Sequence, residues 1–144
     1  MSAGGEGLVE FLGLMRTMRE RCAWKGAQTH ASLAPYLREE ADEVLEAISD
    51  VESVGDAASL RHLCDELGDL LLQIYFHAAI AEEAGAFTMD DVVGGLTAKM
   101  RRRNPHVFGP EAESGRTFTL EEIEEMWQAA KAAERSDVRA PEEL

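Results

Sequence analysis

The chain has 144 residues, 45% of them apolar, and its 14 Lys and Arg residues are outnumbered by 28 Asp and Glu residues, for a formal net charge of -14. This size and apolar content predict one soluble domain over residues 1–144. The charge argues against binding to a nucleic-acid polymer, because such binding needs clustered Lys and Arg side chains. No stretch has the roughly 18 apolar residues of a membrane span, and the first residues lack the basic and apolar regions of a signal peptide. We therefore expect a cytoplasmic protein that does not contact membranes.

Apolar residues recur at helical spacing along most of the chain, and no window alternates with the two-residue period of a strand. The sequence therefore predicts an all-α fold of about five helices. The first covers residues 6–20 and precedes a polar, irregular segment over residues 21–31. Ser32 is a suitable N-cap for a second helix that reaches about Asp50, because its hydroxyl can accept from a free backbone N–H group.

Glycine and proline mark the next boundaries. Gly55 indicates a turn, after which a third helix covers residues 57–84 and ends at Gly85, a position that favours left-handed backbone. Thr88 begins a motif that resembles a capping box, so we expect a fourth helix from there to just before Pro105.

The fifth helix is expected over residues 120–135. It begins with a capping box in which Thr119 precedes Glu122 by three residues. We place the core of the domain at about residues 6–110, and we expect residues 136–144 to be a frayed tail.

The third helix is apolar nearly all round. Between residues 67 and 80 its only clearly polar side chains are Asp69, Gln73 and His77, and these lie with Glu66 on one narrow strip. Such a helix is buried on several faces. Carboxylates that face inward lose several kcal/mol of hydration each, so a positive charge must compensate them.

The second helix carries matching acids. Glu40 and Glu43 repeat the three-residue spacing of Glu66 and Asp69, and antiparallel packing of the two helices would bring the four carboxylates together. Such a cluster needs cations because the like charges repel. Oxygen ligands without Cys select hard ions, so we expect Mg²⁺, with Mn²⁺ as a substitute.

The acids of the second helix and His77 each have a purely structural interpretation as well. An E-E-x-x-E run on a helix is usually a solvated face, but Glu66 and Asp69 in an apolar helix favour a metal site. His77 is more typical of a hydrogen-bonded core histidine than of a ligand, because hard ions do not require imidazole.

A dense basic cluster ends the fourth helix and consists of Lys99, Arg101, Arg102 and Arg103. The helix dipole partly explains cations at this position. Four cations in five residues exceed that need, and Arg and Lys near a metal site are suited to a polyphosphate. The chain has no glycine-rich phosphate loop, so metal and side chains would hold the phosphates.

An aromatic side chain stands in the polar segment before the second helix. Trp24 is followed by the hydrogen-bonding residues Gln28, Thr29 and His30, a combination that can stack a base and contact its edge. Packing of Trp24 into the core is the alternative. Trp127 and Lys131 repeat the pairing of an aromatic with a cation on the last helix, where packing of an acidic amphipathic helix is again the alternative.

Five segments, in order, resemble the MazG family of nucleoside triphosphate pyrophosphohydrolases, within the all-α NTP pyrophosphatase superfamily. They are QTHASL (28–33), REEADEVLEAI (38–48), DELGDLLLQIYFHA (65–78), KMRRRNPHVFG (99–109) and EEMWQAAK (124–131). The resemblance extends from about residue 8 to residue 131. It implies a MazG-like helical bundle completed by homodimerisation, with further pairing into tetramers left open.

The resemblance also implies roles for the acids. The family pattern E-x-x-E followed by E-x-x-D falls on Glu40, Glu43, Glu66 and Asp69, which become Mg²⁺ ligands. Glu39 resembles an extra carboxylate implicated in metal binding or water activation. Either Glu39 or Glu43 would then be the catalytic base.

Other matches concern the substrate. Lys99 and Arg103 match family residues that contact the triphosphate, and Trp127 and Lys131 match a functional Trp and Lys. We therefore assign phosphate binding to Lys99, Arg102, Arg103 and Lys131, and base binding to Trp24, Gln28, His30 and Trp127.

The chain departs from the family pattern at two places. Cys22-Ala23-Trp24-Lys25 stands for the usual C-P-W-D, and Arg103-Asn104-Pro105-His106 stands for R-H-P-H. Both lie where substrate would be selected, so base preference is not transferred from other members.

The predicted function is Mg²⁺-dependent hydrolysis of a (deoxy)nucleoside triphosphate between the α and β phosphates, giving the monophosphate and pyrophosphate. This implies removal of aberrant or surplus nucleotides. One alternative is a regulatory helical module that binds a nucleotide or a partner helix without hydrolysis. A purely structural dimer is another, but it leaves Glu66 and Asp69 in an apolar helix unexplained.

Overall fold

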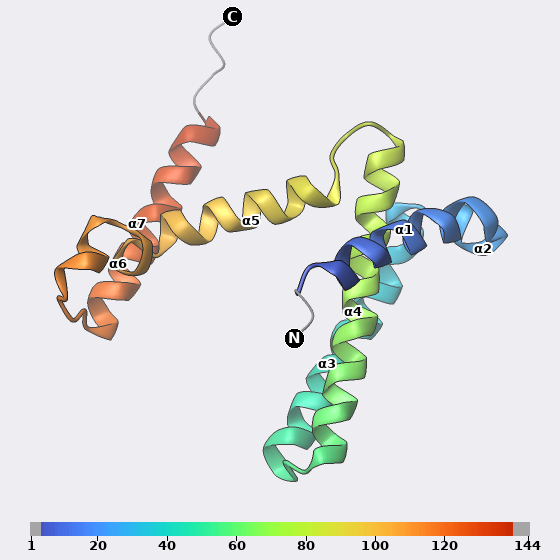
Figure 1. Cartoon of the computed structure of the whole chain (residues 1–144), viewed down its shortest axis with the longest axis horizontal. Coiled ribbons are helices and arrows are strands. Elements are labelled where there is room, and N and C mark those ends of the chain that lie inside the picture. The colour runs from blue at the N-terminus through green and yellow to red at the C-terminus, as the bar shows by residue number, and fades with distance from the viewer. Residues whose placement is uncertain (1–3, 140–144) are drawn as a thin grey trace, which may run out of the picture. The chain divides into compact units, whose positions relative to one another are not determined.

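A computed structural model describes residues 4–139 of the chain, with side chains as far as residue 136. Within this range the structure is helical and has no β-strand, which confirms the all-α prediction (Figure 1). The elements are α1 (Glu6–Arg21), α2 (Ala23–Gly26), α3 (His30–Ser53), α4 (Ala57–Glu83), α5 (Met89–Arg103), α6 (Pro105–Phe108), the 3₁₀ helix η1 (Pro110–Ser114) and α7 (Leu120–Arg139).

The contacts within the chain divide it into two compact units. Unit 1 is Met1–Met89 and unit 2 is Asp90–Leu144. The single domain expected over residues 1–144 stays a prediction, and each unit is described separately below.

The five long helices correspond to the five expected from the sequence, whereas α2, α6 and η1 were missed. Each of these short elements has four or five residues. A single turn is too short to show apolar periodicity, which is why the sequence signal passes over it.

The start of α3 corrects one expectation. Thr29, not Ser32, is the N-cap: its hydroxyl accepts from the Ser32 backbone N–H at 3.1 Å, and the Ser32 hydroxyl accepts from the Thr29 N–H at 2.8 Å. This reciprocal box satisfies two N–H groups at once, so the helix begins three residues earlier than a cap at Ser32 would allow. The helix also ends later, at Ser53 rather than at about Asp50.

Other boundaries are confirmed. Gly55 and Gly85 have φ angles of 66° and 68° and follow the ends of α3 and α4, where left-handed backbone suits glycine. The Thr119 hydroxyl accepts from the Glu122 N–H at 3.1 Å, and the Glu122 carboxylate accepts from the Thr119 N–H at 2.9 Å. This capping box starts α7. The helix continues to Arg139, so its expected end at residue 135 is wrong and residues 136–139 of the expected frayed tail are helical; residues 140–144 lie outside the described residues.

Unit 1 is built on the hairpin of α3 and α4, which lie side by side, while α1 packs on α4 (Figure 1). A buried core joins the three helices, and the Tyr75 hydroxyl donates to the Leu8 carbonyl oxygen at 2.9 Å across it. The buried core residues are Met15, Leu33, Tyr75, Phe76 and Ala79. Burial of this set fixes which face of α4 meets α3, and so fixes where the polar strip of α4 lies.

No helix among the described residues combines the length and the apolar character needed to cross a membrane.

Candidate active site

Three carboxylates meet where α3 and α4 pack against each other. One carboxylate oxygen from each of Glu40, Glu43 and Glu66 lies within 4.8 Å of those from the other two residues. We call these three residues the carboxylate cluster. The spacing Glu40–Glu43 places both acids on one face of α3, and the burial pattern turns that face toward Glu66 on α4.

The carboxylates of the cluster carry like charges, which repel one another. Burial raises the pKa of Glu40 above its ordinary value, and the nearby charge of Glu43 raises it further. The charges of Asp69 and Glu66 add to the effect. A carboxylate whose ionisation is made unfavourable by its neighbours gains from any cation that enters the site.

Two oxygens of the cluster have no hydrogen-bond partner among the described residues. Oε2 of Glu40 and Oε2 of Glu66 are both buried and lack a hydrogen-bond donor. Burial of an unpaired charged oxygen is costly, and a bound cation would remove that cost. Carboxylate oxygens are the ligands that hard divalent cations prefer, so the residues present fit such an ion.

Two other predicted site residues lie beside the cluster. Asp69 is exposed on α4 and is not one of the three residues that meet, although its charge reaches Glu40. Glu39 is exposed on α3, next to Glu40. The assignment of Asp69 as a ligand and of Glu39 as a base stays a prediction.

His62 also contacts the cluster, a contact that was not expected from the sequence. Its Nε2 atom lies 3.0 Å from Oε1 of Glu66, one helical turn away on α4. The i, i+4 spacing was the available signal, since residues four apart are neighbours on a helix.

The other end of the polar strip on α4 meets the start of α3. Nδ1 of His77 lies 2.7 Å from Nδ1 of His30, and the two rings are nearly parallel with centroids 5.0 Å apart. Burial, followed by the charge of His30, lowers the pKa of His77. His77 is thus a hydrogen-bonded, partly buried histidine, whereas His30 has an exposed side chain. Nε2 of His77 and Oε1 of Gln73 are buried, and neither atom has a hydrogen-bond partner in the part of the chain that the structure describes.

The predicted base-binding segment folds as α2 and the turn that follows it. The Trp24 side chain is half exposed, meets Tyr36 edge to face at 5.8 Å, and has the Lys25 ammonium 5.6 Å from its ring centroid. Gln28 is engaged within the chain: its amide nitrogen donates to the Trp24 carbonyl at 2.9 Å, and its amide oxygen accepts from Ser32 at 2.8 Å.

Arg19 holds this segment in place. Its guanidinium donates to the carbonyl oxygens of Lys25 and Gln28, at 2.6 and 3.0 Å, and forms an ion pair with Glu83 on α4. Gly26 sits so close to α1 that a Cβ atom would lie 2.7 Å from the Arg19 carbonyl oxygen. Trp24 is therefore carried by a fixed turn.

The predicted phosphate-binding residues lie in unit 2. Arg102 and Arg103 both bind the Glu134 carboxylate, with Nη-to-oxygen distances of 2.8 and 2.7 Å. The Arg103 hydrogen bond, followed by those of Arg102, lowers the pKa of Glu134 to about 2. The Arg103 guanidinium also covers the Trp127 ring at 5.2 Å. Glu134 was not expected from the sequence, because nothing local links α7 to α5.

The remaining predicted residues of unit 2 stand near this group. Lys99 lies one turn before Arg103 on α5, and Lys131 lies one turn after Trp127 on α7; both are partly buried. Of the predicted substrate-binding residues in unit 2, Arg103 and Trp127 are in direct contact. The roles of all four side chains in substrate binding stay predictions.

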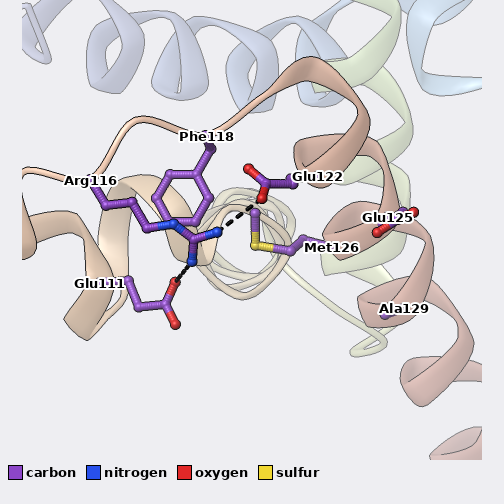
Figure 2. Close-up of a pocket in the computed structure, with 7 residues that line it drawn as sticks. All are labelled: Glu111, Arg116, Phe118, Glu122, Glu125, Met126 and Ala129. Atoms are coloured by element: carbon purple, nitrogen blue, oxygen red, sulfur yellow. Dashed lines mark hydrogen bonds and ion pairs between the residues drawn. The ribbon is translucent and has the colours of Figure 1, made fainter.

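A pocket lies where the segment before α7 folds back on that helix (Figure 2). Arg116 pairs with Glu122 at 2.9 Å and with Glu111 at 3.7 Å, and its guanidinium stacks over Phe118 at 4.7 Å. Met126 lies beside them in the pocket lining. These contacts of Arg116 anchor the segment before α7 onto that helix.

The family model of the MazG nucleotide pyrophosphohydrolase domain matches residues 28–108, which include the whole carboxylate cluster. The chain belongs to the MazG family. This confirms the resemblance drawn from the sequence motifs.

Several proteins are similar in sequence to this chain. The nucleoside triphosphate pyrophosphohydrolase/pyrophosphatase MazG of Thermotoga maritima is 48% identical over 102 residues, which are 69% of this chain and 37% of that protein. The nucleoside triphosphate pyrophosphohydrolases of Mycobacterium tuberculosis and Escherichia coli K12 are 41% and 36% identical, over 94% and 90% of this chain and 38% and 45% of those proteins. The chain thus spans less than half the length of these relatives.

The MazG fold is also seen in a solved structure. The crystal structure of a mazG-related protein from Thermotoga maritima matches with a TM-score of 0.67 and 24% identity, over 85% of this chain and 97% of that chain. The likeness shows a shared helical fold.

Proposed function

We propose that this MazG domain hydrolyses a nucleoside triphosphate between the α and β phosphates, with Mg²⁺ bound by Glu40, Glu43, Glu66 and Asp69. The observation that carries the proposal is the carboxylate cluster with its two buried, unpartnered oxygens. Mn²⁺, a hard ion that carboxylates also bind, is the expected substitute. The names of the relatives, which specify nucleoside triphosphate pyrophosphohydrolases, support the same reaction.

Each group of side chains has a proposed role in the hydrolysis. Glu39 or Glu43 accepts a proton from the water that attacks the α-phosphorus, and the bond from that phosphorus to the bridging oxygen breaks, so that pyrophosphate leaves. A bound divalent cation supplies positive charge that offsets the charge of the phosphates. The residues proposed to bind the phosphate oxygens are Lys99, Arg102, Arg103 and Lys131.

Base binding is proposed for the aromatic and imidazole side chains. Trp24 offers a half-exposed ring, and His30 offers an exposed imidazole edge; Trp127 belongs to the same proposal. Gln28 would have to exchange its bonds to Trp24 and Ser32 to reach a base. The proposed substrates are aberrant or surplus nucleotides of the cytoplasm.

We also propose that the domain acts as a homodimer, with tetramers as a further possibility to be measured. The support is a row of large apolar side chains that the described residues leave exposed on α4, since such rows usually mark interfaces. Leu67, Leu71 and Ile74 are 48%, 37% and 40% exposed. Light scattering should give a dimer mass for the protein and a lower mass for Leu71→Asp.

Product analysis tests the reaction. Incubation of the protein with a panel of normal and damaged dNTPs and Mg²⁺ should release the monophosphate and pyrophosphate, and a chelator should abolish turnover. Release of orthophosphate would refute cleavage between the α and β phosphates. Nucleotide binding without turnover at any metal concentration would instead support the regulatory module.

A further inference from the structure

His62 makes a contact with the carboxylate cluster that the E-x-x-E and E-x-x-D pattern does not include. It lies one turn before Glu66 on α4, and its Nε2 atom is 3.0 Å from Glu66 Oε1. The Glu66 side chain is 15% exposed, whereas that of His62 is 49% exposed. The histidine therefore reaches from the surface of the helix toward an acid that is largely buried.

The direction of this hydrogen bond is assigned from the chemistry of the two groups. A carboxylate oxygen accepts, so we assign the proton to His62 Nε2, which donates to Oε1. A nitrogen that carries a proton and donates it to an acid is not available as a metal ligand. His62 thus acts on Glu66 rather than on a cation.

The bond distinguishes the two oxygens of Glu66. Oε1 is occupied by His62, whereas Oε2 is buried and, like Oε2 of Glu40, has no partner among the described residues. Holding one oxygen restricts the rotation of the carboxylate, and so leaves the buried oxygen as the one free to bind a cation. Partners that orient ligands in this way typically change metal affinity 10- to 100-fold when they are removed.

We propose that His62 is a positioning residue that holds Glu66 Oε1 and thereby presents Glu66 Oε2 to a divalent cation in the carboxylate cluster. This inference rests on the proposed function, because it assumes that the cluster binds a cation. A pair that only stabilised α4 would affect the melting temperature and leave metal affinity unchanged.

The test is direct binding of Mn²⁺ to the intact protein without nucleotide, followed by electron paramagnetic resonance at one fixed pH. His62→Ala is expected to raise the Kd for Mn²⁺ about tenfold or more. His62→Gln should recover most of the affinity, because the Gln amide can donate to Glu66 in place of the ring. Cys64→Ala, an exposed change on the same helix, is the matched control and should keep the wild-type Kd.

The outcomes separate this inference from the proposed function. If the wild-type protein binds Mn²⁺, Glu66→Gln loses it and folded His62→Ala keeps the wild-type Kd, the positioning role is wrong and the metal site stands. The role is also wrong if His62→Gln binds as weakly as His62→Ala. Should His62→Ala not fold, by circular dichroism, then His62→Gln against wild type decides through the same Kd. Failure of the wild-type protein to bind Mn²⁺ would overturn both proposals.

Discussion

The carboxylate cluster of unit 1 and the two arginines of unit 2 differ in whether the chain itself supplies the opposite charge. In unit 1, Glu40, Glu43 and Glu66 meet with two oxygens unpaired, and the pKa of Glu40 is raised. In unit 2, Arg102 and Arg103 share Glu134, whose pKa is lowered to about 2. Two oxygens of the cluster therefore lack a hydrogen-bond partner among the described residues, whereas the two arginines share an anion of the chain itself. A phosphate that binds these arginines must compete with Glu134.

The largest effect is expected from removing charge at the carboxylates. Glu40→Gln and Asp69→Asn should each lower turnover about a hundredfold or more in a folded protein, because a cation that stabilises transition-state charge contributes several kcal/mol. Steady-state kinetics with saturating Mg²⁺ measures this. Glu46→Gln, an exposed acid of the same helix, should keep normal turnover. Near-normal turnover in Asp69→Asn would remove that residue from the ligand set.

The next largest effect is expected on stability, from removing the charge of the acid that pairs with the two arginines. Glu134→Gln should destabilise the protein at neutral pH, because ionised Glu134 is stabilised by Arg103 and Arg102 in the folded state. A lowered folded pKa means that this stability is present above pH 4.5 and is lost as the pH falls toward about 2. Chemical denaturation of both proteins across this range should show a difference that shrinks with acid. A difference independent of pH would contradict the assignment.

In the carboxylate cluster without metal, ionisation of the acid is expected to lower the stability of the folded protein, whereas ionisation of Glu134 raises it. The raised pKa of Glu40 means that its ionised form costs stability, and this cost appears as the pH rises above the ordinary value of 4.5. Metal-free Glu40→Gln should therefore melt above the wild-type protein at pH 8 and match it at low pH. Added Mn²⁺ should stabilise the wild-type protein more than the variant. A lower melting temperature of the metal-free variant at pH 8 would show that the cluster is compensated within the chain.

The smallest effect is expected at the pocket of Figure 2. Arg116→Ala removes half-exposed ion pairs and the contact with Phe118, each worth about 1 kcal/mol or less at such sites. Turnover should not change, because Arg116 anchors the segment before α7 and has no part in the proposed reaction. Arg135→Ala, at an exposed site on α7, is the control for loss of one positive charge. A loss of turnover in Arg116→Ala would assign the pocket a functional role.

Local patterns in the sequence were enough to predict the long helices and the position of the acids on them. Apolar periodicity and capping residues are local signals, so the five long helices and the Thr119 box were found, and three-residue spacing placed Glu40 beside Glu43. The cap at Ser32 was misplaced because Thr29 offers an equally local but reciprocal bond. The single-turn helices escaped because one turn carries no period.

Which charged side chains form pairs depends on how the helices pack. The pairing of Arg102 and Arg103 with Glu134 joins residues more than thirty positions apart, and the contact between His30 and His77 joins residues 47 positions apart. No local pattern encodes such distances, because they depend on how whole helices pack. Even the contact of His62 with Glu66, four residues apart, matters only because packing buries Glu66 against α3. The sequence thus placed acids and bases on helix faces, whereas packing brought the three acids of the cluster together and paired the two arginines with Glu134.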